Sequence, residues 1–99
     1  MNYQLILQFP EKLFNFDYLV QIEEDLTQIL KDDEFDGHDV GSGEINFIIL
    51  TNKPDNAFKS LKQYLVDKEL FNCVKAAYRT IDGETFTVLY PASLKKFSV

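Results

Sequence analysis

The chain has few of the residues on which common catalytic and metal sites depend. Its 99 residues include no tryptophan, one cysteine, Cys73, and one histidine, His38. A single cysteine excludes an internal disulfide and a cysteine-based zinc site, and it fits the reducing cytoplasm. A single histidine excludes the iron site built from two histidines and one carboxylate.

Long apolar segments are also missing. No apolar run approaches the roughly 18 residues that a membrane-spanning helix needs. Residues 1–7 lack the basic region and the cleavage site of a signal peptide and look like a strand instead. We therefore expect a cytoplasmic protein without a membrane partner.

The residues that are abundant indicate a folded core. Hydrophobic residues make up 45% of the chain, with nine phenylalanines and five tyrosines, a composition typical of globular proteins. The length suits one domain. We predict a single domain over residues 1–91, which Pro91 ends, and a short C-terminal tail over residues 92–99.

Negative charge is concentrated in the first part of the chain. Residues 1–44 hold eleven acidic and two basic residues, a balance of −9, whereas residues 45–99 have a balance of +3. An acidic half repels nucleic-acid phosphates, so no nucleic-acid partner is expected. It favours a basic protein partner, or it is ordinary solvated surface that keeps the protein soluble.

The first half of the chain shows a strand, a helix and a hairpin. Apolar and polar residues alternate over residues 2–9, as in a strand with one apolar face. Asn15 or Asp17 can cap a helix whose apolar stripe runs to Leu30. The glycine-rich turn 41–43 then joins two further strands, of which the second is nearly all apolar and predicted to lie inside the sheet.

The second half repeats the alternation of helix and strand. Pro54 opens a second helix. Residues 71–78 are strand-like, with Val74, Ala76 and Tyr78 on one face. Asp82-Gly83 predicts a hairpin turn, and residues 85–90 alternate as a last strand.

The order β-α-β-β-α-β-β predicts an α+β fold. It matches a ferredoxin-like sandwich with an antiparallel-rich sheet, an added C-terminal strand and two helices on one face. Right-handed crossovers lead us to expect the first and third strands side by side and parallel at the sheet centre.

The face of the sheet opposite the helices is predicted to be mixed in character. It would carry Gln4, Ile6, Gln8, Glu44, Asn46, Ile48, Lys75, Ala77, Arg79, Thr85 and Thr87. A homodimer or another partner would cover this face, or it is an ordinary half-wetted surface. The aromatic residues Tyr3, Phe47, Tyr78 and Phe86 are expected on the helix side, which argues against base stacking.

Two stretches carry a resemblance to known proteins. They are Gly41-Ser42-Gly43-Glu44-Ile45-Asn46-Phe47-Ile48 and Tyr78-Arg79-Thr80-Ile81-Asp82-Gly83-Glu84-Thr85-Phe86-Thr87-Val88-Leu89-Tyr90-Pro91. Together they resemble small single-domain bacterial proteins of unassigned function. The resemblance covers about half the chain and implies no named family, no activity and no catalytic residue.

One polar group near the glycine turn is a candidate ligand site. His38 lies close in sequence to Asp36, Asp39 and Glu44, and weak metal binding by three of these residues is one interpretation. A calcium loop starting at Asp32 is disfavoured because its twelfth position is glycine. We predict no cofactor and no dedicated metal site. The residues assigned to a ligand rim are His38, Glu44, Asn46 and Arg79.

The acidic residues give the leading functional hypothesis. It is a non-catalytic, cytoplasmic protein-interaction domain, in one version an immunity-type inhibitor of a basic toxin, that also forms a homodimer. The predicted partner-binding residues are Glu23, Glu24, Asp32, Asp33, Glu34, Asp36 and Asp39. The alternatives are a small-ligand or metal sensor and a small dimeric ferredoxin-like enzyme. No catalytic residue is assigned, and an enzyme is the less favoured interpretation.

Overall fold

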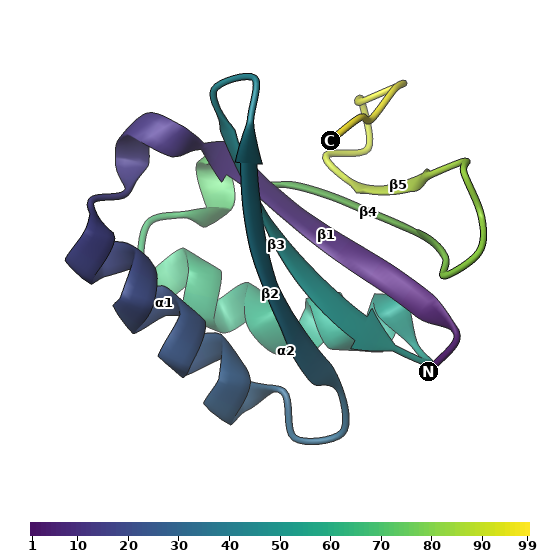
Figure 1. Ribbon diagram of the computed structural model, residues 1–99, viewed down its shortest axis with the longest axis horizontal. Helices are drawn as coiled ribbons and strands as arrows, with labels where there is room; N and C mark the ends of the chain where they lie inside the picture. Colours follow the sequence, from purple (N-terminus) through teal and green to yellow (C-terminus); the bar gives the residue numbers. More distant parts are fainter.

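Two helices pack on one face of a five-stranded antiparallel sheet in the computed structural model, which describes residues 1–99 (Figure 1). Two short 3₁₀ segments, η1 and η2, connect the larger elements. The elements are β1 (Tyr3–Pro10), η1 (Glu11–Leu13), α1 (Phe16–Ile29), β2 (Glu34–Gly41), β3 (Glu44–Thr51), α2 (Pro54–Asp67), η2 (Phe71–Cys73), β4 (Lys75–Thr80) and β5 (Thr87–Tyr90). Neither long helix combines the length and apolar character needed to cross a bilayer.

The helix starts follow from local chemistry. Asn15 caps α1, and its side-chain oxygen accepts a hydrogen bond of 2.7 Å from the Tyr18 N–H. This bond satisfies one of the amides that a helix start leaves without a partner. Pro54 occupies the first turn of α2, where its fixed φ and missing N–H do no harm. Both predicted starts are confirmed.

The glycine-rich turn is a two-residue hairpin between β2 and β3. Ser42 and Gly43 have φ values of 55° and 78°, and Gly41 pairs with Glu44 across the turn. Positive φ at both central residues is the signature of the turn whose twist matches that of the flanking strands. The hairpin prediction is confirmed, and Gly43 takes the second positive φ without steric penalty.

The strand order is β2-β3-β1-β4-β5. The predicted adjacency of β1 and β3 is confirmed, but the predicted parallel direction is wrong, since these strands pair antiparallel from Tyr3↔Thr51 to Pro10↔Glu44. The crossover through α1 makes β1 and β2 parallel. Because β3 returns from β2 through a tight turn and inserts between them, it runs opposite to both.

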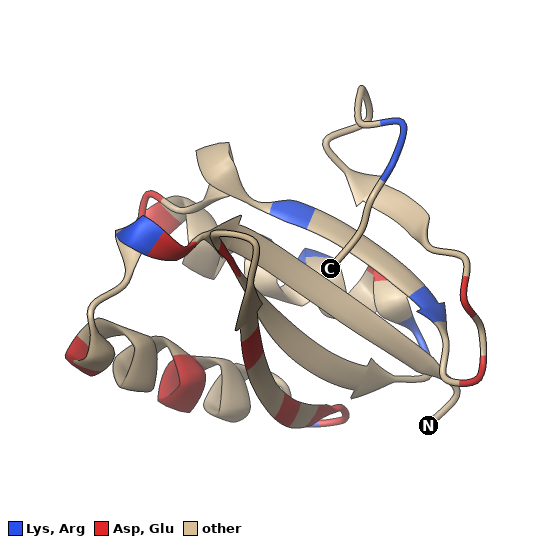
Figure 2. Cartoon of the chain, turned by 45° about the horizontal axis from the view of Figure 1, so that its top comes forward, with Lys and Arg blue, Asp and Glu red and all other residues tan.

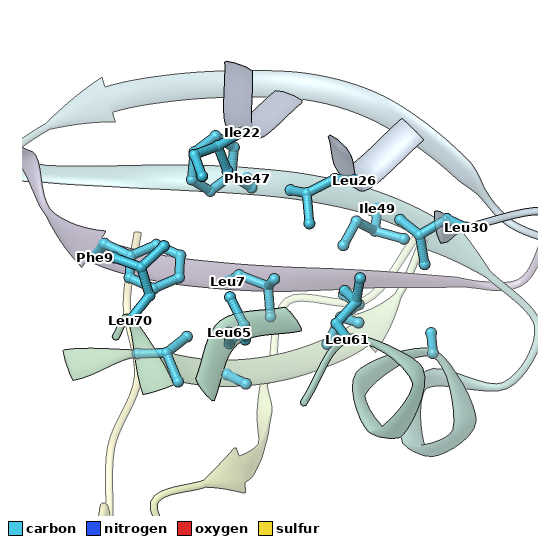
Figure 3. Packing of buried hydrophobic residues seen from close by; sticks show 14 of the residues in the cluster. Leu7, Phe9, Ile22, Leu26, Leu30, Phe47, Ile49, Leu61, Leu65 and Leu70 are labelled. Atoms are coloured by element: carbon cyan, nitrogen blue, oxygen red, sulfur yellow. The ribbon is translucent and has the colours of Figure 1, made fainter. Parts of the chain in front are cut away.

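The core lies between the helices and the sheet (Figure 3). Every second residue of β1, namely Leu5, Leu7 and Phe9, points into it and is at most 1% exposed. Because a strand alternates its side chains, one face of β1 can be fully apolar. The rest of the cluster is Ile22, Leu26, Leu30, Ile45, Phe47, Ile49, Ala57, Leu61, Leu65, Leu70, Val74 and Ala76.

The last two strands differ from their predicted limits. Residues 71–73 form η2, and β4 begins only at Lys75. A turn closed by the hydrogen bond from Gly83 N–H to Thr80 C=O is followed by an extended loop, so β5 starts at Thr87. The Asp-Gly pair therefore marks a turn, as predicted, but one that lies before an irregular segment and does not join two strands directly.

This loop and a register shift change the faces of the last strand. Thr87 pairs with Tyr78 and lies on the helix side, opposite to the prediction. Phe86 lies on the other face, where its ring meets Phe97 at 5.0 Å and the Arg79 guanidinium at 4.7 Å. The prediction that Phe86 points toward the helices is therefore wrong.

The chain's own C-terminal segment covers part of the face opposite the helices. Gln8 Nε2 donates a 2.9 Å hydrogen bond to the carbonyl oxygen of Ser98. Ile6, Gln8 and Asn46, all on this face, are only 2%, 5% and 1% exposed. No second chain is needed to bury these three residues.

The contact between α1 and α2 includes one strongly perturbed phenol. The Tyr64 hydroxyl donates a 2.6 Å hydrogen bond to Asp25 Oδ2, while Gln21 Nε2 donates to Asp25 Oδ1 at 2.9 Å. Burial, followed by the hydrogen bond to the Asp25 carboxylate, raises the pKa of Tyr64 well above its usual value of 10.0.

Tyr64→Phe is expected to make the protein less sensitive to alkali. The raised pKa means that the native state keeps the Tyr64 proton after the unfolded state has lost it. Below the ordinary tyrosine pKa of about 10, both states are protonated and this stabilisation is fully present. It is lost as the pH rises above 10 toward the native pKa. Urea unfolding at pH 8 and pH 11 measures the effect, and equal losses of stability in both proteins would contradict it.

Candidate functional site

The most uniformly charged part of the molecule is one edge of the sheet and the helix beside it. β2 is the last strand on its side and pairs only with β3. Neither β2 nor α1 contains a lysine or an arginine, and acidic residues mark both elements in Figure 2. We call this region the acidic edge, which consists of Glu23, Glu24, Glu34, Asp36 and Asp39.

A bulge in β2 places Glu34 and Asp39 on the same face of the sheet, although they are five residues apart. Phe35 pairs with Ile49, but the next pair is Gly37 with Ile48, so Asp36 is an extra residue. Gly37 has a φ of 111°, which only glycine adopts readily. The bulge breaks the simple alternation, so a spacing of two residues does not set the faces of Asp36 and His38.

His38 is attached to α1. Its Nδ1 lies 3.0 Å from Glu23 Oε2, and the two side chains are 32% and 24% exposed. The ring also packs edge-on against Phe47, with the centroids 6.5 Å apart. Such an exposed pair contributes at most about 1 kcal/mol. The contact therefore fixes the position of the Glu23 side chain beside β2, and it adds little to the stability of the fold.

Asp39 ends a row of side-chain hydrogen bonds that crosses the sheet. Asn46 Nδ2 donates to Asp39 Oδ1 at 3.0 Å, and Gln8 Nε2 donates to Asn46 Oδ1 at 2.9 Å. Gln8 also donates to the carbonyl of Ser98. We call Asp39, Asn46 and Gln8 the amide row. Its hydrogen bonds satisfy the side chain of Asn46, which is buried and does not line an open rim.

The four residues predicted as a ligand rim occupy separate places. Arg79 lies on β4, which β1 and β3 separate from β2, and its Nε donates to Gln4 Oε1 at 2.9 Å. Glu44 is half-buried at the start of β3, where it pairs with Gly41. No three His, Cys, Asp or Glu side chains converge in an arrangement that could hold a metal ion.

Two of the predicted partner-binding acids lie in a different setting. Asp32 and Asp33 follow α1 and line a hollow of about 630 Å³ together with Lys31 and Lys53. Two lysines and two aspartates therefore share this hollow. The predicted acidic surface is thus divided into an acidic edge without lysine or arginine and a loop of mixed charge.

Cys73 and a second hollow are the remaining candidate features. Burial raises the pKa of the Cys73 thiol, which keeps it in its unreactive protonated form. The thiol donates to the Leu70 carbonyl at 3.3 Å. A second hollow, of about 660 Å³, is lined by Pro10, Glu11, Lys12, Phe14 and Gly43, and neither of these two hollows is lined by His38 or Arg79.

Sequence reasoning missed two features of the site. One is the contact between His38 and Glu23, which are 15 residues apart and meet only when α1 packs beside β2. The other is the amide row. Its sequence signal is that β1, β3 and β2 each place a polar residue on the same face of the sheet. No family model, curated protein or solved structure matches the chain. The function is therefore inferred from the geometry of the chain alone.

Proposed function

We propose that the protein is a non-catalytic, cytoplasmic interaction domain whose acidic edge binds a basic protein partner. One concrete form is an immunity-type protein that inhibits a basic toxin or nuclease. We also propose that the fold is ferredoxin-like, which the order β-α-β-β-α-β of the first six main elements and the neighbouring positions of β1 and β3 support.

The observation that carries the proposal is the acidic edge itself. Its five carboxylates come from two adjacent elements that contain no lysine or arginine, and β2 presents one side free of any paired strand. A field of one sign speeds the approach of an oppositely charged partner and excludes partners of like charge. A basic protein therefore fits this surface best.

A homodimer would use another surface. Because two copies carry the same charge at the acidic edge, contact between these edges is unfavourable. We propose that self-association uses the part of the opposite sheet face that the C-terminal segment leaves uncovered.

Charge reversal tests the binding of the partner. The triple variant Glu24→Lys, Glu34→Lys, Asp36→Lys changes three exposed carboxylates of the acidic edge. We expect the affinity for a partner captured from native cells to fall by about 100-fold, since each exposed interfacial charge contributes about 1 kcal/mol. Isothermal titration calorimetry measures the affinity, and sedimentation of the same samples gives the oligomeric state.

The matched control places the same charge change elsewhere. Glu11→Lys, Asp82→Lys, Glu84→Lys also reverses three exposed carboxylates, but outside the acidic edge. It is expected to retain most of the affinity. Capture of no protein partner, or an equal loss of affinity in both triple variants, would contradict the proposed site.

The sensor and enzyme alternatives draw less support from the geometry. His38 is engaged by Glu23, and the polar atoms of Asn46 are bonded within the amide row. A thermal-shift screen with metal ions and metabolites would favour a sensor if a ligand raised the melting temperature and His38→Ala or Arg79→Ala removed that effect.

A further inference from the structure

We propose that the partner binds by adding an extended, lysine- and arginine-rich segment as a sixth strand along the outer edge of β2. This inference rests on the proposed function and specifies its mode of contact. Main-chain hydrogen bonds would supply affinity, and the carboxylates on either side would select basic side chains.

The backbone of β2 offers the necessary groups. Gly41 and Glu44 flank a two-residue turn and exchange hydrogen bonds across it. In an antiparallel pair, hydrogen-bonded and non-hydrogen-bonded residues alternate. Val40 and His38 therefore direct their N–H and C=O groups away from β3, toward the free edge.

Carboxylates border this edge on both faces of the sheet. Glu34 and Asp39 pair with Leu50 and Asn46, whose side chains lie on the face away from the helices. Glu23 and Glu24 lie on α1, on the other face. Successive side chains of an added strand point to opposite faces. Basic residues on both sides of that strand would thus meet an acid.

The acidic edge, which includes the surface of α1, also has room for the apolar part of a basic side chain. Val40 is 49% exposed, although it lies within a strand. A shallow hollow of about 380 Å³ lies on α1 beside the contact between Glu23 and His38, lined by Val20, Glu23, Glu24, Thr27 and Gln28. Lysine and arginine commonly bury their methylene groups while the charged end reaches a carboxylate.

The same features explain why a second copy is not the occupant. Charged side chains and bulges on an edge strand protect a protein from pairing with itself. Here every charge on β2 is negative, so another β2 is repelled, whereas a basic strand is attracted. The charge of the edge therefore selects its occupant.

Peptide binding tests the mode of contact. The probe is a peptide of the length of β2 in which pairs of lysine alternate with pairs of threonine and valine, so that both faces carry charge when it is extended. Its matched control carries N-methyl groups on alternate amides, which keep the charge and remove main-chain donors. We expect the unmodified peptide to bind at least about tenfold more tightly, the equivalent of one or two hydrogen bonds. Hydrogen exchange at the His38 and Val40 amides should slow on binding.

A protein variant tests the same edge. Val40→Pro removes an N–H that faces the free edge, a position where strands tolerate proline, and Val40→Thr keeps that N–H. We expect Val40→Pro to weaken binding of the unmodified peptide about tenfold and Val40→Thr to leave it nearly unchanged. Circular dichroism checks that both variants fold. If Val40→Pro does not fold, the pair of peptides decides alone.

The outcomes separate this inference from the proposed function. Strand addition is overturned if both peptides bind equally and the β2 amides show no change in exchange, even where charge reversal abolishes binding of the partner. The proposed function is overturned if charge reversal leaves binding of the partner intact. Tighter binding of the unmodified peptide together with slower exchange at His38 and Val40 supports strand addition.

Discussion

Phe47→Ala is expected to lower the free energy of unfolding by about 3–5 kcal/mol, because the truncation leaves a large cavity in the core. Phe47 is 0% exposed, and its ring centroid lies 5.8 Å from that of Phe9, 5.7 Å from Phe14 and 6.2 Å from Phe35. The total free energy of unfolding of a small domain is only about 5–15 kcal/mol, so this one substitution removes a large part of it. Urea denaturation measures the loss.

Phe16→Ala is the matched control for this substitution. Phe16 starts α1 and is 77% exposed, so its removal creates no cavity. We expect a change within about 0.5 kcal/mol, as for most surface substitutions. Similar losses in Phe16→Ala and Phe47→Ala would show that Phe47 does not hold the core together.

Asn46→Asp is expected to destabilise the protein strongly at neutral pH. The change replaces the Nδ2 donor that bonds Asp39 with a carboxylate oxygen, at a residue that is 1% exposed. A carboxylate in a buried position would then face the exposed Asp39 carboxylate. We expect a loss of about 3 kcal/mol at pH 7, the usual size for a buried charge without a partner. Urea unfolding measures it.

The loss should depend on pH with a definite sign. Burial and the neighbouring Asp39 carboxylate would raise the native-state pKa of the introduced carboxyl above its unfolded value of about 3.9. The native state then binds the extra proton more readily, so the defect is smallest below pH 4 and grows as the pH rises through the native pKa. Asn72→Asp, at an exposed position, is the control. A defect in Asn46→Asp that does not change with pH would refute the explanation.

Much of the fold could be predicted because local signals were consistent. Asn15, Pro54 and the Ser42-Gly43 turn each act through neighbours a few residues away, and the structure has all three in their predicted roles. Apolar periodicity also gave the correct buried face of α1 and of β1. Such patterns depend on the geometry of a single element, which a sequence displays directly.

The errors in the faces of residues arose where an irregularity changed the register of a strand. The loop before β5 and the shift between Ala76 and Ala77 moved Phe86 and Thr87 to unpredicted faces. The bulge at Asp36 likewise interrupts the alternation of faces within β2. A slip of one residue reverses the faces of a strand, and composition does not reveal where a strand accommodates an extra residue.

The sequence showed which acidic residues belong to the candidate site, but it did not show how these residues are grouped on the surface. The charge imbalance pointed to the right part of the chain. It did not reveal that Lys31 and Lys53 lie with Asp32 and Asp33, whereas Glu34 and Asp36 have no basic neighbour on β2. That distinction depends on packing between distant segments, since Lys53 comes from the turn before α2.

The central position of β1 has a consequence for the order in which the structure can be completed. The first strand of the sheet in chain order lies in the middle of the sheet, and its two neighbours are β3 and β4. A nascent chain released only as far as Thr51 can pair one side of β1, while the other side waits for Lys75–Thr80. Contacts so distant in sequence slow folding. The side of β1 that pairs with β4 therefore stays open until Lys75–Thr80 has left the ribosome.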